Sequence, residues 1–232
     1  MMKSMRTFEN NLYMKAFRWV YNMLVFNLLF TLLNLPLFLA FNLLAVDSRN
    51  TWFFLLAALP FGGAFAGLIG SLEQFAMNKE CEPAKVFFSQ IYTFWLKGTV
   101  YWLTALACLV VIATDLLFFA ATPWFQWISP LLFVVGVIGL GIFLNSIYFQ
   151  IKNPLAGSKD IYKISLYYTL RKWYTTGLNG LLLVLIPVCM LLKPQFGYLL
   201  APSLLGGLIY LNSGKLYRPE VTNKNLVKVI KQ

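Results

Sequence analysis

Long apolar stretches separated by short polar gaps fill most of this chain. A bilayer core needs about 20 consecutive apolar residues for each helical span. By that criterion we expect an all-α polytopic membrane protein, one integral membrane domain over residues 1–232 that ends in a basic cytoplasmic tail at 213–232. The six predicted transmembrane helices are residues 19–46, 52–76, 98–121, 124–149, 176–192 and 196–212.

The spans form pairs that look repeated. The pairs begin near residues 19, 98 and 176, and residues 89–93 resemble residues 165–169 at an offset of 76. Likewise, Leu144-Asn145-Ser146 is echoed by Leu211-Asn212-Ser213. Both a true duplication into three parallel hairpins and chance similarity are open. Prolines interrupt the last pair, so a re-entrant hairpin is an alternative there to two full crossings.

Composition and charge support a membrane protein and orient it. Hydrophobic residues make up 59% of the chain and charged residues 12%, which is too apolar for one soluble core of this size. Every Lys and Arg except Arg49 and Lys193 lies in alternate gaps or at the two ends. The positive-inside rule therefore predicts cytoplasmic N- and C-termini. Because the cations are scattered over separate loops, we expect the lipid bilayer, and no nucleic acid, as their partner.

The two long cytoplasmic connections predict amphipathic helices. In the first, apolar side chains recur at helical spacing from Phe87 to Trp95, between Lys85 and Lys97; the second runs from Asp160 to Tyr174. Aromatic and basic residues together favour the inner membrane surface, while docking of a partner protein is the alternative. The candidate docking residues are Phe87, Ile91, Trp95 and Lys97.

Polar residues within the predicted spans are the candidates for a functional site. They are Asp115, Glu73, Asn27, Asn34, Asn145 and Asn212. Asp115 lies some six residues before the outer end of its span, where an ionisable side chain is a functional hypothesis by default. Glu73 lies near the inner end of its span and can snorkel or form an ion pair. Asn27 and Asn34 share one helix face with Asn42, suited either to helix packing or to lining a polar cavity.

The sequence offers no pattern typical of catalysis. It contains no histidine, which removes the commonest general base and zinc ligand, and its three cysteines are not spaced as metal ligands. The glycines in 62–70 include the Gly63-xxx-Gly67 spacing that allows close helix packing, and Pro60 predicts a kink just before them. We therefore expect a protein that is not an enzyme and has no cofactor.

One segment resembles a known family. Gly62-Gly63-Ala64-Phe65-Ala66-Gly67-Leu68, followed by Lys79-Glu80-Cys81-Glu82-Pro83 and then the aromatic helix with Phe94 and Trp95, resembles the YesL-like bacterial membrane proteins. Gly63 replaces the proline usual there, and Glu73 and Gln74 replace the usual basic residues. The resemblance covers the first 100 or so residues best.

The YesL-like resemblance implies an association rather than a mechanism. Such proteins are often encoded beside carbohydrate uptake systems and their sensors in Gram-positive bacteria, and they bring no catalytic residues. We therefore expect a non-enzymatic accessory or regulatory protein that contacts an ABC-type sugar transporter or a sensor kinase, with a homo-oligomer also open. The alternative is a small-molecule transporter or channel lined by Asp115, Asn27 and Asn34.

Overall fold

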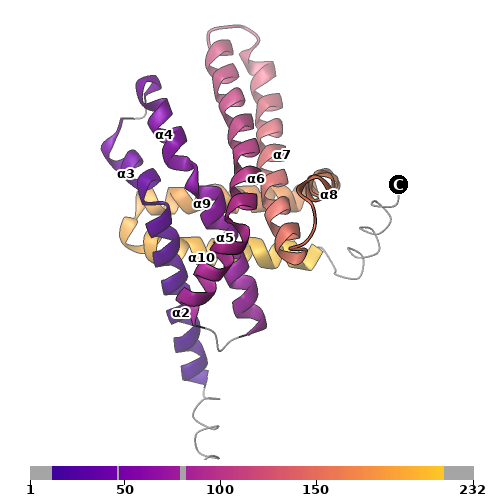
Figure 1. Cartoon of the computed structure of the whole chain (residues 1–232). Helices are drawn as coiled ribbons and strands as arrows, with labels where there is room; N and C mark the ends of the chain where they lie inside the picture. The colour runs from indigo at the N-terminus through magenta and orange to yellow at the C-terminus, as the bar shows by residue number, and fades with distance from the viewer. Residues whose placement is uncertain (1–11, 46, 79–81, 217–232) are drawn as a thin grey trace, which may run out of the picture.

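The computed structural model describes residues 12–45, 47–78 and 82–216, and within them it is all helical (Figure 1). The 3-10 turn η1 covers Ser48–Asn50. The α-helices are α2 (Leu12–Leu33), α3 (Leu35–Leu43), α4 (Thr51–Ala58), α5 (Pro60–Met77), α6 (Pro83–Phe119), α7 (Phe125–Lys152), α8 (Ser158–Arg171), α9 (Trp173–Leu192) and α10 (Pro194–Leu216). The expected all-α class is confirmed.

Five helical segments in the described part of the chain are long and apolar enough to cross a membrane. They are Tyr13–Leu33, Thr51–Met77, Pro83–Phe119, Phe125–Lys152 and Trp173–Leu192. These segments are the hallmark of a multi-pass membrane protein. The predicted sixth span, 196–212, forms most of α10, which is not among the five. The predicted tail begins inside α10, and its residues beyond Leu216 lie outside the described ranges.

Two predicted spans are each divided in two. The first begins earlier than predicted and is divided at Asn34 into α2 and α3, since Pro36 in the first turn of α3 has no N–H with which to continue α2. The second is divided at Leu59, and α5 begins at Pro60, so the kink predicted there is confirmed. The indole N–H of Trp102, on α6, donates a hydrogen bond of 2.8 Å to the Ala58 carbonyl at this break.

Helix α5 lies at the centre of the fold, packed most closely against α6. Its glycines face α6: a Cβ placed on Gly62 would lie 2.6 Å from the Gly98 carbonyl oxygen, and one on Gly98 would lie 2.7 Å from the Gly62 carbonyl oxygen. The adjacent Gly63 accommodates Trp95, and one turn further along α5 Gly67 accommodates Ile91. The close packing predicted from the glycine spacing is therefore present, with α6 as the partner helix.

The first predicted connecting helix is not a separate element. Residues 83–97 continue without a break into 98–119 as the 37-residue helix α6, which is about 55 Å long against a hydrocarbon core of about 30 Å. Residues 98–119 contain a single charged side chain, Asp115, whereas residues 83–97 carry Lys85 and Lys97. Helix α6 is therefore longer than one crossing needs, and we call its segment 83–97, which packs along α5, the α6 extension.

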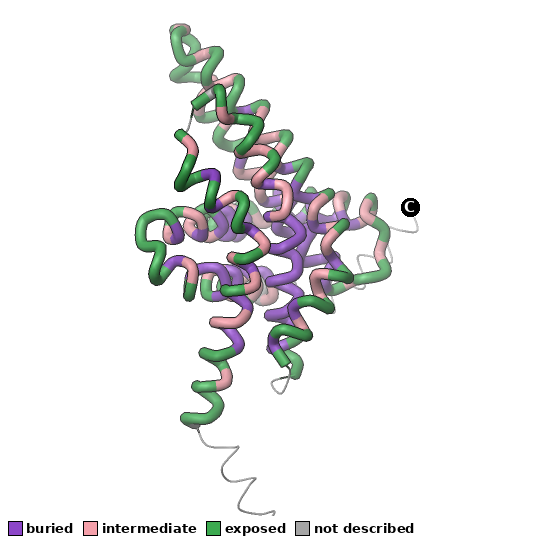
Figure 2. Tube along the Cα trace, turned by 60° about the vertical axis from the view of Figure 1, so that its left-hand side comes forward, coloured by how far each residue is buried: buried purple, intermediate pink, exposed green. Residues whose placement is uncertain are grey.

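Helices α9 and α10 form a hairpin that runs across the α6–α7 hairpin rather than alongside it (Figure 1). Burial is concentrated where the two hairpins and α5 meet, while the far end of α6–α7 is largely exposed (Figure 2). Membrane helices tilt from the bilayer normal by about 20° on average. Hairpins that cross in this way cannot both stand close to that normal.

Exposed aromatic side chains mark the two ends of the α6–α7 hairpin. Trp124 and Trp127 are exposed at the turn between the helices, and Trp173 and Tyr174 are exposed at the start of α9, on the side where α7 ends. Tryptophan and tyrosine concentrate at the two membrane interfaces. These two groups of aromatic side chains are therefore typical of residues at the two membrane interfaces.

The glycine contact between α5 and α6 predicts that one added methyl group at this contact destabilises the fold. Gly62→Ala or Gly98→Ala should lower the free energy of unfolding by about 1–3 kcal/mol, because the new Cβ meets rigid backbone. Gly207→Ala in α10 is the matched control, since its Cβ would meet no atom within 4 Å and should be neutral or stabilise the helix. The thermal unfolding midpoint of each variant in detergent measures this; equal midpoints for all three would contradict the contact.

Candidate functional site

Asn27 on α2 bonds to the backbone of α10. Its side-chain N–H donates to the Leu199 carbonyl, and its Oδ1 accepts a hydrogen bond of 2.6 Å from the Ser203 N–H. In an unbroken α-helix these two backbone groups, four residues apart, pair with each other. Pro202 lies between them, and proline kinks a helix interior. The buried Asn27 amide thus satisfies both backbone groups beside the proline.

The other asparagines of the predicted polar face bond within their own helices. The Asn34 amide donates to the Phe30 carbonyl at 2.9 Å, and the Asn42 amide donates to the Phe38 carbonyl at 2.7 Å. Oδ1 of Asn34 is buried and has no hydrogen-bond partner among the described residues. Of the three, Asn27 is used for helix packing, the first of the two uses that the sequence left open.

A second set of polar contacts joins α7 to α8 and α9 to α10. The Asn145 amide donates to the Thr169 hydroxyl at 2.8 Å, connecting α7 with α8. The Asn179 amide donates to the Ser213 hydroxyl at 3.0 Å, and the Asn212 amide donates to Oδ1 of Asn179 at 2.7 Å. Sequence reasoning missed Thr169, Asn179 and Ser213, although the Asn179 amide within an apolar span was a visible signal.

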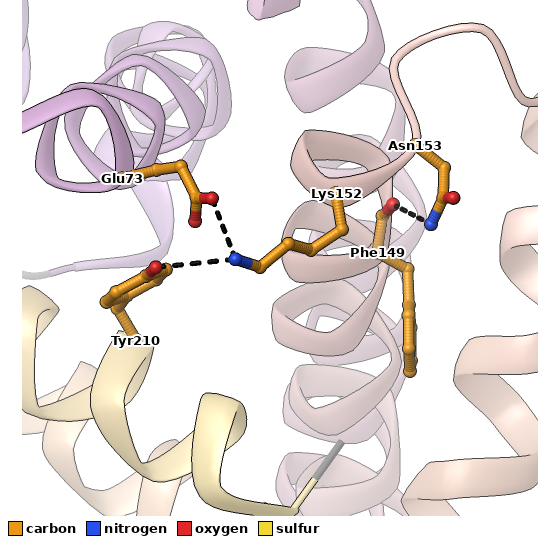
Figure 3. Close-up of polar contacts among 5 residues, drawn as sticks. All are labelled: Glu73, Phe149, Lys152, Asn153 and Tyr210. Carbon is orange, nitrogen blue, oxygen red and sulfur yellow. Dashed lines mark hydrogen bonds and ion pairs between the residues drawn. The ribbon is translucent and has the colours of Figure 1, made fainter. Parts of the chain in front are cut away.

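The charged cluster of the site joins three helices (Figure 3). Nζ of Lys152, at the end of α7, lies 2.7 Å from Oε1 of Glu73 on α5, forming an ion pair. It also lies 3.4 Å from the Tyr210 hydroxyl on α10, and 5.4 and 5.8 Å from the ring centroids of Tyr210 and Tyr148. The ammonium thus has a carboxylate and two aromatic rings around it, an arrangement that favours a cation.

Glu73 is the more deeply buried partner of this ion pair. Its residue is 8% exposed, and its second carboxylate oxygen, Oε2, is buried with no hydrogen-bond partner among the described residues. Lys152 keeps about a third of its side chain exposed. Of the two readings that the sequence allowed for Glu73, ion pairing is the one that the structure contains.

Asp115 is far from this cluster. It is half-buried on α6 close to the α6–α7 turn, at the level opposite Lys152, roughly 35 Å away along the hairpin by helical rise. The structure therefore does not bring Asp115 together with Glu73, Asn27 or Asn34. Within the described ranges, no three His, Cys, Asp or Glu side chains are grouped as they would be to hold a metal ion.

The predicted docking residues face the interior of the chain. Phe87 is fully buried in the core, and Ile91 and Trp95 pack against the glycines of α5. Lys97 donates a hydrogen bond of 2.8 Å to the Pro154 carbonyl in the α7–α8 turn. The apolar periodicity identified a packed helix face, and this face is covered by α5 and by the turn after α7. The opposite face of the α6 extension is the one left exposed.

Comparison of the chain with protein-family models, curated proteins and solved structures gives no match. The YesL-like resemblance of the segment 62–68 is not tested by these comparisons and stays a prediction.

The Asn27 contact predicts an energetic coupling with Pro202. Asn27→Leu should destabilise the protein by about 1–3 kcal/mol, because it leaves two backbone groups of α10 unpaired in an apolar environment. In a Pro202→Ala background the same substitution should cost less, since α10 can then close its own hydrogen bonds. Thermal unfolding of the four proteins in detergent measures the coupling. Asn42→Leu is the control, and an Asn27→Leu loss no larger than this control would refute the role of the amide.

The ion pair predicts that substitution of Lys152 destabilises the fold more than substitution of Glu73 does. Lys152→Met should destabilise the fold by up to about 3 kcal/mol, because it leaves the buried Glu73 carboxylate unpaired. Glu73→Gln should cost less, since Lys152 can turn toward solvent. The double variant should recover much of the loss caused by Lys152→Met alone. Unfolding midpoints measured at low salt test this order, and a larger loss for Glu73→Gln would contradict it.

Proposed function

We propose that this chain is a non-enzymatic accessory or regulatory protein of the bacterial cell membrane that acts by contact with another membrane protein. The observation that carries the proposal is an exposed apolar stripe on the α6 extension, formed by Phe88, Tyr92 and Leu96. These side chains are 55%, 94% and 78% exposed and lie four residues apart, so they share one helix face. We call them the α6 stripe.

The position of the α6 stripe favours a protein partner. The length of α6 and the lysines of the α6 extension favour a position of this segment outside the hydrocarbon core, where lipid tails would not cover Phe88 and Leu96. Contiguous apolar surface outside the bilayer typically marks a protein contact. The other face of the extension is fixed against α5, so the stripe is presented on a rigid helix. A rigid apolar helix face is suited to packing against a helix of a partner.

The polar side chains within the predicted spans favour a scaffold function for this protein rather than a transport function. Asn27, Asn145 and Asn179 each bond to a neighbouring helix, and the Tyr101 hydroxyl on α6 donates to Gln150 on α7 at 2.6 Å. Such bonds hold helices in a fixed arrangement. The small-molecule transporter or channel is the second candidate and rests on the intramembrane carboxylate of Asp115.

For the topology we propose six crossings in three hairpins, with both termini in the cytoplasm. Lys97 and Lys152 lie at one end of the α6–α7 hairpin, and Trp124 lies at the other. By the positive-inside rule the end with the lysines is the cytoplasmic one, which supports this topology. In this topology α10 returns the chain to the side where α9 begins. The proposed assignment to a carbohydrate uptake system, with an ABC-type sugar transporter or a sensor kinase as the partner, rests on the YesL-like resemblance alone.

The α6 stripe predicts which substitutions break the partner contact. Phe88→Ser, Tyr92→Ser and Leu96→Ser together should abolish co-purification with a sugar transporter or sensor kinase after crosslinking in native cells, identified by mass spectrometry. The fold should persist, because all three side chains are exposed. Met77→Ser with Leu155→Ser, which alters two other exposed apolar side chains, is the control and should leave the complex intact.

Two outcomes would count against this function. An intact complex with the stripe variant would show that the partner binds elsewhere. A lone monomer or homo-oligomer, together with uptake by the pure protein in liposomes that Asp115→Asn removes, would favour the transporter.

A further inference from the structure

Helix α8 is held in place by its two neighbours in the chain. It follows α7 after the short turn 153–157 and precedes α9 with only Lys172 between, and both neighbours are long and apolar enough to span the bilayer. Its inner face packs on the core through Ile161, Ile164 and Tyr168, with the Tyr168 ring 5.2 Å from that of Phe149 on α7. Further contacts, from Thr169 to Asn145 and from the Tyr162 hydroxyl to Thr104, fix the helix across α7 and α6.

The outer face of α8 combines cations with apolar side chains. It consists of the exposed residues Lys159, Lys163, Leu166, Tyr167, Leu170 and Arg171, hereafter the α8 face. These residues recur at three- and four-residue spacing, so they form one stripe along the helix. The exposed Trp173 and Tyr174 extend the same aromatic and basic character into the first turn of α9.

The cations of the α8 face are available to a ligand. In the part of the chain that the structure describes, neither lysine of this face forms an ion pair with an acidic side chain. Asp160, the acidic residue of the helix, is half-buried on the edge of the stripe formed by Tyr167 and Arg171. Arg171 donates a hydrogen bond to the Tyr167 hydroxyl and lies 5.5 Å from that ring centroid, which orients its guanidinium along the face.

We infer that the α8 face binds the headgroups of anionic phospholipids. Cations placed at the headgroup level attract phosphate, while Leu166, Leu170 and Tyr167 enter the boundary between headgroups and acyl chains. The occupant follows from charge complementarity and from continuity with the bilayer that surrounds α7 and α9. This binding is independent of the partner protein proposed above, because it needs only this chain and lipid.

Lipid binding by the purified full-length protein tests the inference. In a neutral detergent, native mass spectrometry should show preferential retention of phosphatidylglycerol over phosphatidylcholine. Each basic residue near a membrane surface strengthens attraction to anionic lipid roughly five-fold. Lys159→Gln, Lys163→Gln and Arg171→Gln together should therefore reduce phosphatidylglycerol retention at least tenfold, with no change for phosphatidylcholine. The unfolding midpoint should hold, since all three side chains are exposed.

A charge-matched variant separates this face from the overall positive charge of the chain. Lys15→Gln, Lys85→Gln and Lys193→Gln remove the same charge from exposed positions on other helices and turns. The inference is supported if this control variant retains phosphatidylglycerol while the variant with three substitutions in the α8 face loses it. An equal loss from both variants, or equal retention of the two lipids by the unaltered protein, would overturn it.

Discussion

The contact between α5 and α6 is the constraint on which the rest of the fold depends. Gly62 and Gly98 bring the two backbones together, and larger side chains such as Trp95 and Ile91 then fit over the remaining glycines of α5. Apolar burial gives helices little reason to associate within lipid, so close packing and hydrogen bonds must hold them together. With α6 fixed in this way, α5 presents its other faces to α2, α7 and α10, and it becomes the centre of the core.

Side chains from neighbouring helices bond to the backbone beside two of the prolines. At Pro60 the indole of Trp102 bonds to the Ala58 carbonyl, and at Pro202 the amide of Asn27 bonds on both sides of the proline. Unpaired backbone groups are costly in an apolar medium, so these bonds stabilise the backbone beside both prolines. The same side chains that complete the backbone also connect the helices. The hydrogen bonds at the breaks therefore belong to the tertiary structure as much as to the helices themselves.

Local patterns in the sequence predicted the features that depend on local physics. Apolar run lengths located the helices, Pro60 marked a break, and the Gly63-xxx-Gly67 spacing marked a close approach, because each depends on a few neighbouring residues. The periodicity of residues 83–97 revealed a packed face but not whether α5, lipid or another protein covers it. Asn27 meets Ser203 across 176 positions, and no local pattern encodes that pairing. For the same reason, the sequence did not predict that the α9–α10 hairpin crosses the α6–α7 hairpin.

The unbroken course of α6 makes one helix common to the core and to the α6–α7 turn. From the Gly62–Gly98 contact, about 22 Å of α6 runs along α5 and about 31 Å runs on to the turn. After its first turn α6 contains no proline, so no break lies along that length to absorb a change of direction. A small change in the angle at which α6 crosses α5 at Gly98 would therefore displace the α6–α7 turn.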